Sequence, residues 1–233
     1  MILSKTIGGY IKLPGYKVLS FDKISSTQNY AHDMIANGTA HDHTAIVANA
    51  QYAGRGRYRR TWVSHHGNLY VSFIFQCEER DSRLAYAVAV AIVDTLSEYG
   101  IKSEIKWPND VLIDGKKVSG VLIEYAGRFV IVGIGINVAT NPTVAEYKTD
   151  KLSNYVNVSI SDLFNRLSKN LEKWKNADFN SVRLRWMDAA TGLNATVKYR
   201  GESVTLIGIN DSGALVVRRQ NEYMLIHGDE ILM

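Results

Sequence analysis

The chain has a single cysteine and no long apolar run, and each shortage excludes a class of protein. Cys77 is the one cysteine among 233 residues, so no internal disulfide is possible and a reducing compartment is expected, with Cys77 as a structural thiol. The longest apolar stretch, residues 84–93, is too short to cross a bilayer. Residues 1–10 lack the apolar core of a signal peptide. The sequence therefore predicts a cytoplasmic protein with no membrane partner.

The chain also lacks a strong charge imbalance, internal repeats and low-complexity tracts. Its 27 basic and 23 acidic residues leave a net charge of +4, which suits a nucleotide or an acidic protein partner without requiring nucleic acid. The hydrophobic share of 46% is that of a packed globular chain. This length accommodates one catalytic domain and a small appendage.

Hydrophobic periodicity and turn residues predict an α+β fold, a mainly antiparallel sheet covered by helices. Strands are expected at 16–21, 44–50 and 69–75, followed by an antiparallel meander at 104–107, 111–113, 118–125 and 129–138. Helices are expected after Ser25-Ser26-Thr27, after Asp81-Ser82, and over 161–190, where Trp174 and Trp186 point to the core. Four short strands between 195 and 226 indicate a small β-barrel. The predicted domains are 1–190 and 191–233.

The stretch GRGRYRRTW, residues 54–62, has no periodicity and brings four guanidinium groups into one loop. Its glycines allow a ligand to approach the backbone closely, and its arginines can bind phosphate or carboxylate. A solvated basic loop is the simplest interpretation of this segment alone, and a nucleic-acid-binding arm is a functional alternative.

Two further segments carry polar groups beside predicted strands. KWPND, residues 106–110, exposes a lysine, an amide and a carboxylate at a proline turn, a plausible nucleotide and Mg²⁺ site or a simple strand-end turn. Lys116 and Lys117 begin the next strand, where side chains alternate, so the two should point to opposite faces. Gly133 and Gly135 weaken a strand unless something must lie close to its backbone.

Taken together, five motifs in this order resemble the catalytic domain of biotin–protein ligases: Ser26-Thr27-Gln28, GRGRYRRTW, KWPND, Lys117 in KKVSGVLIE, and GIGIN. The resemblance covers essentially the whole chain, since that family ends in an SH3-like domain matching 195–233. It implies a class II synthetase-like fold and an ATP-dependent biotin–[acetyl-CoA-carboxylase] ligase. Such an enzyme forms biotinyl-adenylate and transfers biotin to a lysine of a biotin carboxyl carrier protein.

The resemblance also assigns site residues. Biotin-binding candidates are Ser26, Thr27, Gln28, Gln51, Gly54, Arg55, Gly56, Arg57, Lys117 and Gly120. ATP-binding candidates are Arg57, Arg60, Trp62, Lys106, Asn109, Asp110 and Asn137. Catalytic candidates are Lys117, Arg55 and Arg57, and Asp110 is the residue associated with Mg²⁺. The chain departs from the family at Gln28, where asparagine is usual, and in having no helix-turn-helix before residue 16, so DNA is not an expected partner.

The expected chemistry explains these residue types. Biotin's carboxylate attacks the α-phosphate of ATP, and Arg55, Arg57 and Lys117 would offset the repulsion between the two anions. The mixed anhydride must be kept from water, so the arginine loop is expected to act as a mobile lid. Asp110 is the candidate base for the acceptor lysine. A lipoate–protein ligase or a nucleic-acid-binding module remains the alternative, and both a monomer and a homodimer are compatible with the sequence.

Overall fold

The computed structural model describes residues 13–227, so the expectations for residues 1–10 and for the last part of the C-terminal domain, 228–233, lie outside the described residues. The chain forms two compact units. The first comprises the residues up to Arg80 together with Lys116–Ser168, and the second comprises Asp81–Gly115 together with the residues from Lys169 onward. The domain boundary between residues 190 and 191 stays a prediction.

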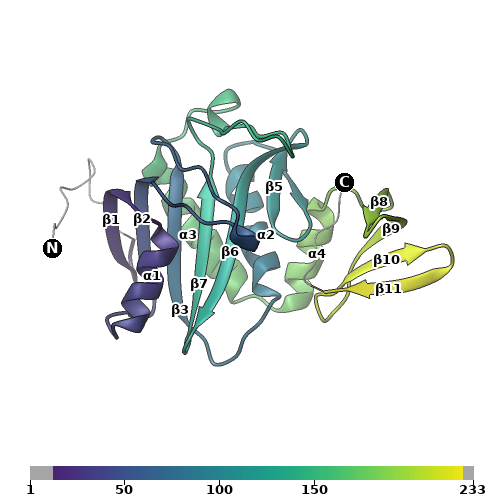
Figure 1. Ribbon diagram of the computed structural model, residues 1–233, viewed down its shortest axis with the longest axis horizontal. Helices are drawn as coiled ribbons and strands as arrows, with labels where there is room; N and C mark the ends of the chain where they lie inside the picture. Colours follow the sequence, from purple (N-terminus) through teal and green to yellow (C-terminus); the bar gives the residue numbers. More distant parts are fainter. Residues whose placement is uncertain (1–12, 228–233) are drawn as a thin grey trace. The chain divides into compact units, whose positions relative to one another are not determined.

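The first unit contains five strands in the order β1 (Lys17–Ile24), β2 (Thr44–Gln51), β3 (Leu69–Gln76), β7 (Phe129–Ile136) and β6 (Lys116–Ala126). Figure 1 shows them side by side. Strands β1 and β2 are parallel and are connected by helix α1 (Thr27–Ala36), whereas the other pairs are antiparallel. The predicted α+β class, the mainly antiparallel sheet and the positions of these strands are confirmed.

The two faces of this sheet have different neighbours because side chains alternate along each strand. On one face, Ile74 packs with Ala31 and Met34 of α1. On the other face, Phe73 stacks on Phe164 in the first half of α3 (Ile160–Lys175), with ring centroids 6.0 Å apart. Strand β3 is therefore buried on both sides, as its continuous apolar sequence requires.

The second unit contains α2 (Leu84–Ser97), the hairpin of β4 (Glu104–Lys106) and β5 (Asp110–Ile113), and α4 (Phe179–Ala189). The expected cap of α2 by Asp81-Ser82 is wrong. The Asp81 side chain does not cap α2; it accepts hydrogen bonds from the backbone and guanidinium of Arg83. The helical region expected over 161–190 is confirmed. It consists of two helices, α3 and α4, because Asp178 caps the second one and accepts a hydrogen bond from the amide of Ser181.

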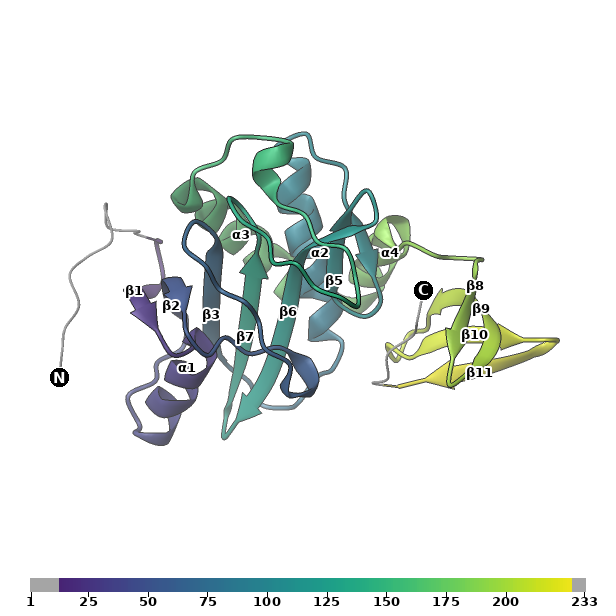
Figure 2. The same cartoon turned by 45° about the horizontal axis from the view of Figure 1, so that its top comes forward.

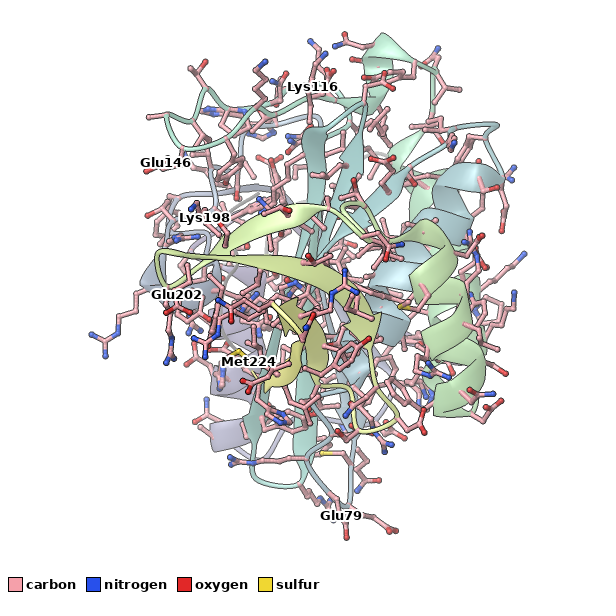
Figure 3. All side chains as sticks on the ribbon, turned by 90° about the vertical axis from the view of Figure 1, so that its right-hand side faces the viewer. Glu79, Lys116, Glu146, Lys198, Glu202 and Met224 are labelled. Atoms are coloured by element: carbon pink, nitrogen blue, oxygen red, sulfur yellow. The ribbon has the colours of Figure 1, made fainter. Side chains whose placement is uncertain are left out.

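The C-terminal strands form a four-stranded antiparallel sheet in the order β11 (Glu222–Ile226), β10 (Leu215–Arg219), β9 (Glu202–Ile209) and β8 (Thr196–Tyr199). Figure 3 labels Lys198, Glu202 and Met224 on this sheet. Within the second unit, Trp174 and Trp186 are buried as expected, at 9% and 0% exposure. No helix within residues 13–227 is long and apolar enough to span a membrane.

Candidate active site

Helix α1 begins at the polar turn that the sequence indicated. The Ser26 side chain caps the helix by accepting a hydrogen bond from the amide of Gln28 at 3.2 Å. The amide of Thr27 donates to Oε1 of Gln51 at 2.8 Å, and Nε2 of Gln51 donates to Ser64 at 2.8 Å. These contacts fix the helix start against the end of β2, so four of the biotin-binding candidates are brought together.

Gln28 reaches further across the sheet than the first two residues of this turn. Its side chain is 3% exposed; Oε1 lies 2.9 Å from Oγ of Ser72, and Nε2 donates to Glu124 at 3.0 Å. A Cβ at Gly133 would lie 2.6 Å from Oε1 of Gln28. The glycine therefore makes room for the longer amide, which answers the sequence-level question of how glutamine fits where asparagine is usual.

Trp62 covers a floor of glycines on β6 and β7. Gly120 and Gly135 are cross-strand partners, and Cβ atoms at these positions would lie 3.0 Å and 2.6 Å from the indole ring of Trp62. The expectation that the glycines of β7 allow a close neighbour is confirmed, although the neighbours here are the side chains of Trp62 and Gln28. The Nε1 of Trp62 is buried and has no hydrogen-bond partner among the described residues.

The arginine loop, residues 54–62, folds back on itself and crosses the sheet over β7 and β6 (Figure 2). The amide of Trp62 donates to the carbonyl of Gly54 at 2.9 Å, and the amide of Gly56 donates to the carbonyl of Arg60 at 2.8 Å. The tip is a 3-10 turn, η1 (Arg57–Arg59), in which Tyr58 has a φ of 54°. The guanidinium groups of Arg57 and Arg60 lie 5.0 Å and 5.9 Å from the Tyr58 ring.

Arg55 binds the loop to strand β6. Its Nη2 and Nη1 donate to the two carboxylate oxygens of Glu124 on β6, at 2.6 Å and 3.0 Å. Burial alone would raise the pKa of Glu124, but hydrogen bonds from His32 and Gln28 and the charge of Arg55 hold it below its usual range. Glu124 was not singled out from sequence; an acidic residue on an apolar strand was the available signal.

Lys117 and Lys116 have different partners. Nζ of Lys117 lies 5.4 Å from the ring centroid of Trp62 and 5.0 Å from that of Tyr147. Nζ of Lys116 instead lies 3.0 Å from Oδ2 of Asp150, whose side chain is 7% exposed. Tyr147 and Asp150 are residues that sequence reasoning missed, because their segment has no strong periodicity.

Asn137 follows β7 at the edge of the glycine floor. It is 2% exposed, and its Nδ2 donates to the carbonyl of Asp150 at 3.0 Å. Its Oδ1 is buried and has no partner within the part of the chain that the structure describes. An acceptor in this position is available to a ligand, since a buried polar atom without a partner is costly.

The KWPND segment belongs to the second unit. Trp107 is 4% exposed and donates from Nε1 to the hydroxyl of Tyr86 at 3.0 Å, which fixes the turn. Lys106 and Asp110 are directly opposite each other across the β4–β5 hairpin. Asn109 is buried between them in sequence, at 5% exposure. These candidates thus form a cluster of their own, whereas all other candidates belong to the first unit.

Comparisons with known proteins agree with this arrangement. Residues 20–141, more than half of the chain, match the model of the biotin/lipoate A/B protein ligase family. This chain belongs to that family. The matched range contains every candidate from Ser26 to Asn137, and the family therefore covers the helix start, the arginine loop, the glycine floor and the KWPND hairpin.

Similar proteins include the bifunctional ligase/repressor BirA of Bacillus subtilis, 31% identical over 93% of this chain and 74% of that protein. The biotin–[acetyl-CoA-carboxylase] ligase of Paracoccus denitrificans is 31% identical over 74% of this chain and 83% of its own length. Among solved structures, the biotin protein ligase of Aquifex aeolicus in complex with biotin and ATP is 28% identical with a TM-score of 0.80. That match covers 92% of this chain and 97% of the other.

Proposed function

We propose that this chain is a biotin–protein ligase that activates biotin with ATP and transfers it to a lysine of a biotin carboxyl carrier protein. The observation that carries the proposal is the glycine floor of Gly120 and Gly135, with Lys117, Trp62 and the start of α1 around it. The relatives named as biotin ligases, one of them a structure holding biotin and ATP, support biotin over lipoate.

In the first step, a carboxylate oxygen of biotin bonds to the α-phosphorus of ATP and pyrophosphate leaves. Thr27, Gln51 and the Gly54–Gly56 backbone would orient biotin, because they surround the start of α1. Lys117 would stand beside the meeting anions, since its side chain lies against Trp62 and over Gly120, on the glycine floor. Arg57 and Arg60, near the tip of the loop, would bind phosphate groups of ATP. Asn137 would accept a hydrogen bond from ATP with its buried Oδ1.

We also assign a role in nucleotide binding to Lys106, Asn109 and Asp110. Mg²⁺ is usually held by one or two carboxylates together with substrate phosphates, and the hairpin offers one carboxylate, Asp110, beside an amide. This donor set fits a magnesium ion brought by ATP, which would supply charge neutralisation for the departing pyrophosphate. Lys106, opposite Asp110, adds a cation to the same turn.

In the second step, the amine of the carrier lysine bonds to the acyl carbon, AMP leaves and the nitrogen loses a proton. Asp110 is our candidate acceptor of that proton. We assign carrier docking to the C-terminal region, 191–233, as a separate domain. Removal of the residues after Ala190 should impair transfer more than adenylate formation. Because Gly208 contacts Met187 of α4, circular dichroism must first show that the shortened chain is folded.

We further propose that the enzyme works in the cytoplasm, where ATP is available and the Cys77 thiol stays reduced. A homodimer is a second proposal. Within the described residues, β8 and β11 are the edge strands of the four-stranded sheet. The backbone groups on the outer side of an edge strand can pair with a strand of another chain. Light scattering at several protein concentrations, with and without biotin and ATP, distinguishes a dimer from a monomer.

The decisive experiment offers biotin, lipoate and octanoate separately to the enzyme with ATP and measures pyrophosphate release and carrier labelling. We expect release and labelling with biotin alone. Activity with lipoate and none with biotin would overturn the proposal. Binding to RNA or DNA is measured in parallel across a salt titration, since tight and steeply salt-dependent binding would support the nucleic-acid alternative.

A further inference from the structure

The Glu124 carboxylate is the meeting point of three segments of the first unit. Gln28 and His32, one helical turn apart on α1, contribute Nε2 atoms that each lie 3.0 Å from Oε2 of Glu124. Arg55 approaches from the arginine loop with both terminal nitrogens. The carboxylate itself is carried by β6, so one side chain connects the helix, the loop and the sheet.

Arg55 is held on its other side as well. Its Nη1 also lies 3.1 Å from Oδ1 of Asn29, so the guanidinium bridges α1 and β6. A two-pronged arginine–carboxylate pair fixes the orientation of both groups, in contrast to the single contact that a lysine would make. The charge of Arg55 is therefore already matched within the protein.

Near the tip of the loop, three side chains contact one another. Tyr58 is 55% exposed, and the contacts of Arg57 and Arg60 described above are with Tyr58 itself, inside the loop. At its base, Arg55 and Thr61 form an isolated bridge. The pair of Arg55 and Glu124 therefore connects the base of this small hairpin to the sheet, next to the segment that carries Arg57 and Arg60.

We infer that Glu124 is a positioning residue, which holds the arginine loop in place on the sheet by binding Arg55. Arg55 is then the anchor of this loop, while Arg57 and Lys117 face the substrates. The inference rests on the proposed function and refines it. It reassigns Arg55 from the charge that offsets the meeting anions, as the sequence predicted, to the group that holds the other arginines in place.

The test compares Glu124→Gln, Arg55→Lys, Arg55→Gln and the double variant Glu124→Gln/Arg55→Gln with the unaltered enzyme. Glu202→Gln is the matched control, because Glu202 on β9 also pairs with an arginine, Arg219, at 2.6 Å but lies on the C-terminal sheet (Figure 3). We expect Glu124→Gln and Arg55→Lys each to raise the KM for biotin about 10- to 100-fold, the range for a lost hydrogen bond to a charged group, with a smaller change in kcat.

Trypsin cleavage inside the loop, measured without substrates, provides a second readout. Cleavage after Arg59 or Arg60 should be faster in Glu124→Gln and in Arg55→Lys, and unchanged in Glu202→Gln. The double variant should be no worse than the more affected of Glu124→Gln and Arg55→Gln measured singly, because each substitution breaks the same pair.

Two results would overturn the inference. One is an unchanged KM and cleavage rate in Glu124→Gln. The other is loss of adenylate formation in Arg55→Gln at saturating biotin while Glu124→Gln stays active, since Arg55 would then contact the reacting groups. If Glu124→Gln does not fold, the inference is tested with Arg55→Gln alone, because Arg55 is exposed and its substitution should leave the protein folded. Absence of biotin-dependent pyrophosphate release in the unaltered enzyme would instead defeat the proposed function, and the cleavage comparison would still test the anchor.

Discussion

The Lys116 ammonium is paired with the Asp150 carboxylate, at 3.0 Å, across 34 residues of sequence. Asp150 also accepts hydrogen bonds from the amide of Lys151 and the hydroxyl of Tyr155, both at 2.9 Å, and from the side chain of Asn154. Lys116 therefore has a structural partner of its own, different from the contacts of Lys117. Its partner Asp150 fixes the chain segment that contacts Asn137.

We predict that Lys116→Ala lowers the free energy of unfolding by about 1 kcal/mol, because Asp150 loses its charge partner while keeping its other donors. The effect stays small since the Lys116 side chain is 43% exposed and partly screened by solvent. Urea unfolding measures it. The control is Lys198→Ala, where an exposed lysine contacts Ser203 and should cost nothing measurable. Equal losses in the two variants would contradict a stabilising pair.

Asp150 also predicts a loss of stability in acid. Burial alone would raise its pKa, but the hydrogen bonds from Lys116, Lys151, Tyr155 and Asn154 lower the pKa to about 2, from 3.8. The unfolded chain therefore binds the proton more readily. The stabilisation is complete above about pH 4 and disappears as the pH falls through 2, with a total on the order of 2 kcal/mol.

Urea titrations between pH 6 and pH 2.5 test this prediction. Stability of the unaltered protein should fall more steeply below pH 4 than stability of Asp150→Asn, which has no proton to gain at this position. Glu124 contributes to both proteins alike, so the difference between the two curves isolates Asp150. Parallel curves would show that Asp150 titrates no differently in the folded and unfolded chain.

The strands and the first helix were predictable because their signals are local. The apolar pattern of residues 69–75 and the Ser26 cap each identify an element without knowledge of its neighbours. The break between α3 and α4 was missed because Asn176, Ala177 and Asp178 are polar or small residues that a helix also tolerates. There the cap formed by Asp178 outweighs the helical periodicity.

The site residues that belong to sequence motifs could be predicted, whereas their contacts with one another could not. The glycines of β7 indicated a close neighbour, but the sequence did not say that Trp62 and Gln28 are the neighbours. The pair of Arg55 and Glu124 spans 69 residues and depends on the antiparallel register of β6 with β7. Such pairs follow from strand order, which local patterns do not contain.

Gly135→Ala should displace Trp62 from the sheet, because the new Cβ would lie 2.6 Å from the indole nitrogen. We expect a higher KM for biotin and weaker adenylate formation. In a Trp62→Ala background the same glycine substitution should have little further effect, since the clash is gone. Pyrophosphate release from all four proteins completes the cycle. Additive losses would mean that Gly135 acts independently of Trp62.

Lys117→Ala should lower the rate of adenylate formation about 10²–10³-fold, the usual cost of removing one preorganised charge contact from a closed site. Lys117→Arg should restore only part of it. The lysine stem lies over Gly120, where a Cβ would come within 3.2 Å of its Cε, and its ammonium lies between the rings of Trp62 and Tyr147. A planar guanidinium fork cannot replace a compact ammonium between two oxygen ligands. Single-turnover biotinyl-adenylate formation compares both variants with Lys116→Ala, which should stay near the unaltered rate wherever it is folded. A Lys116→Ala enzyme slower than Lys117→Ala would show that the central cation is Lys116.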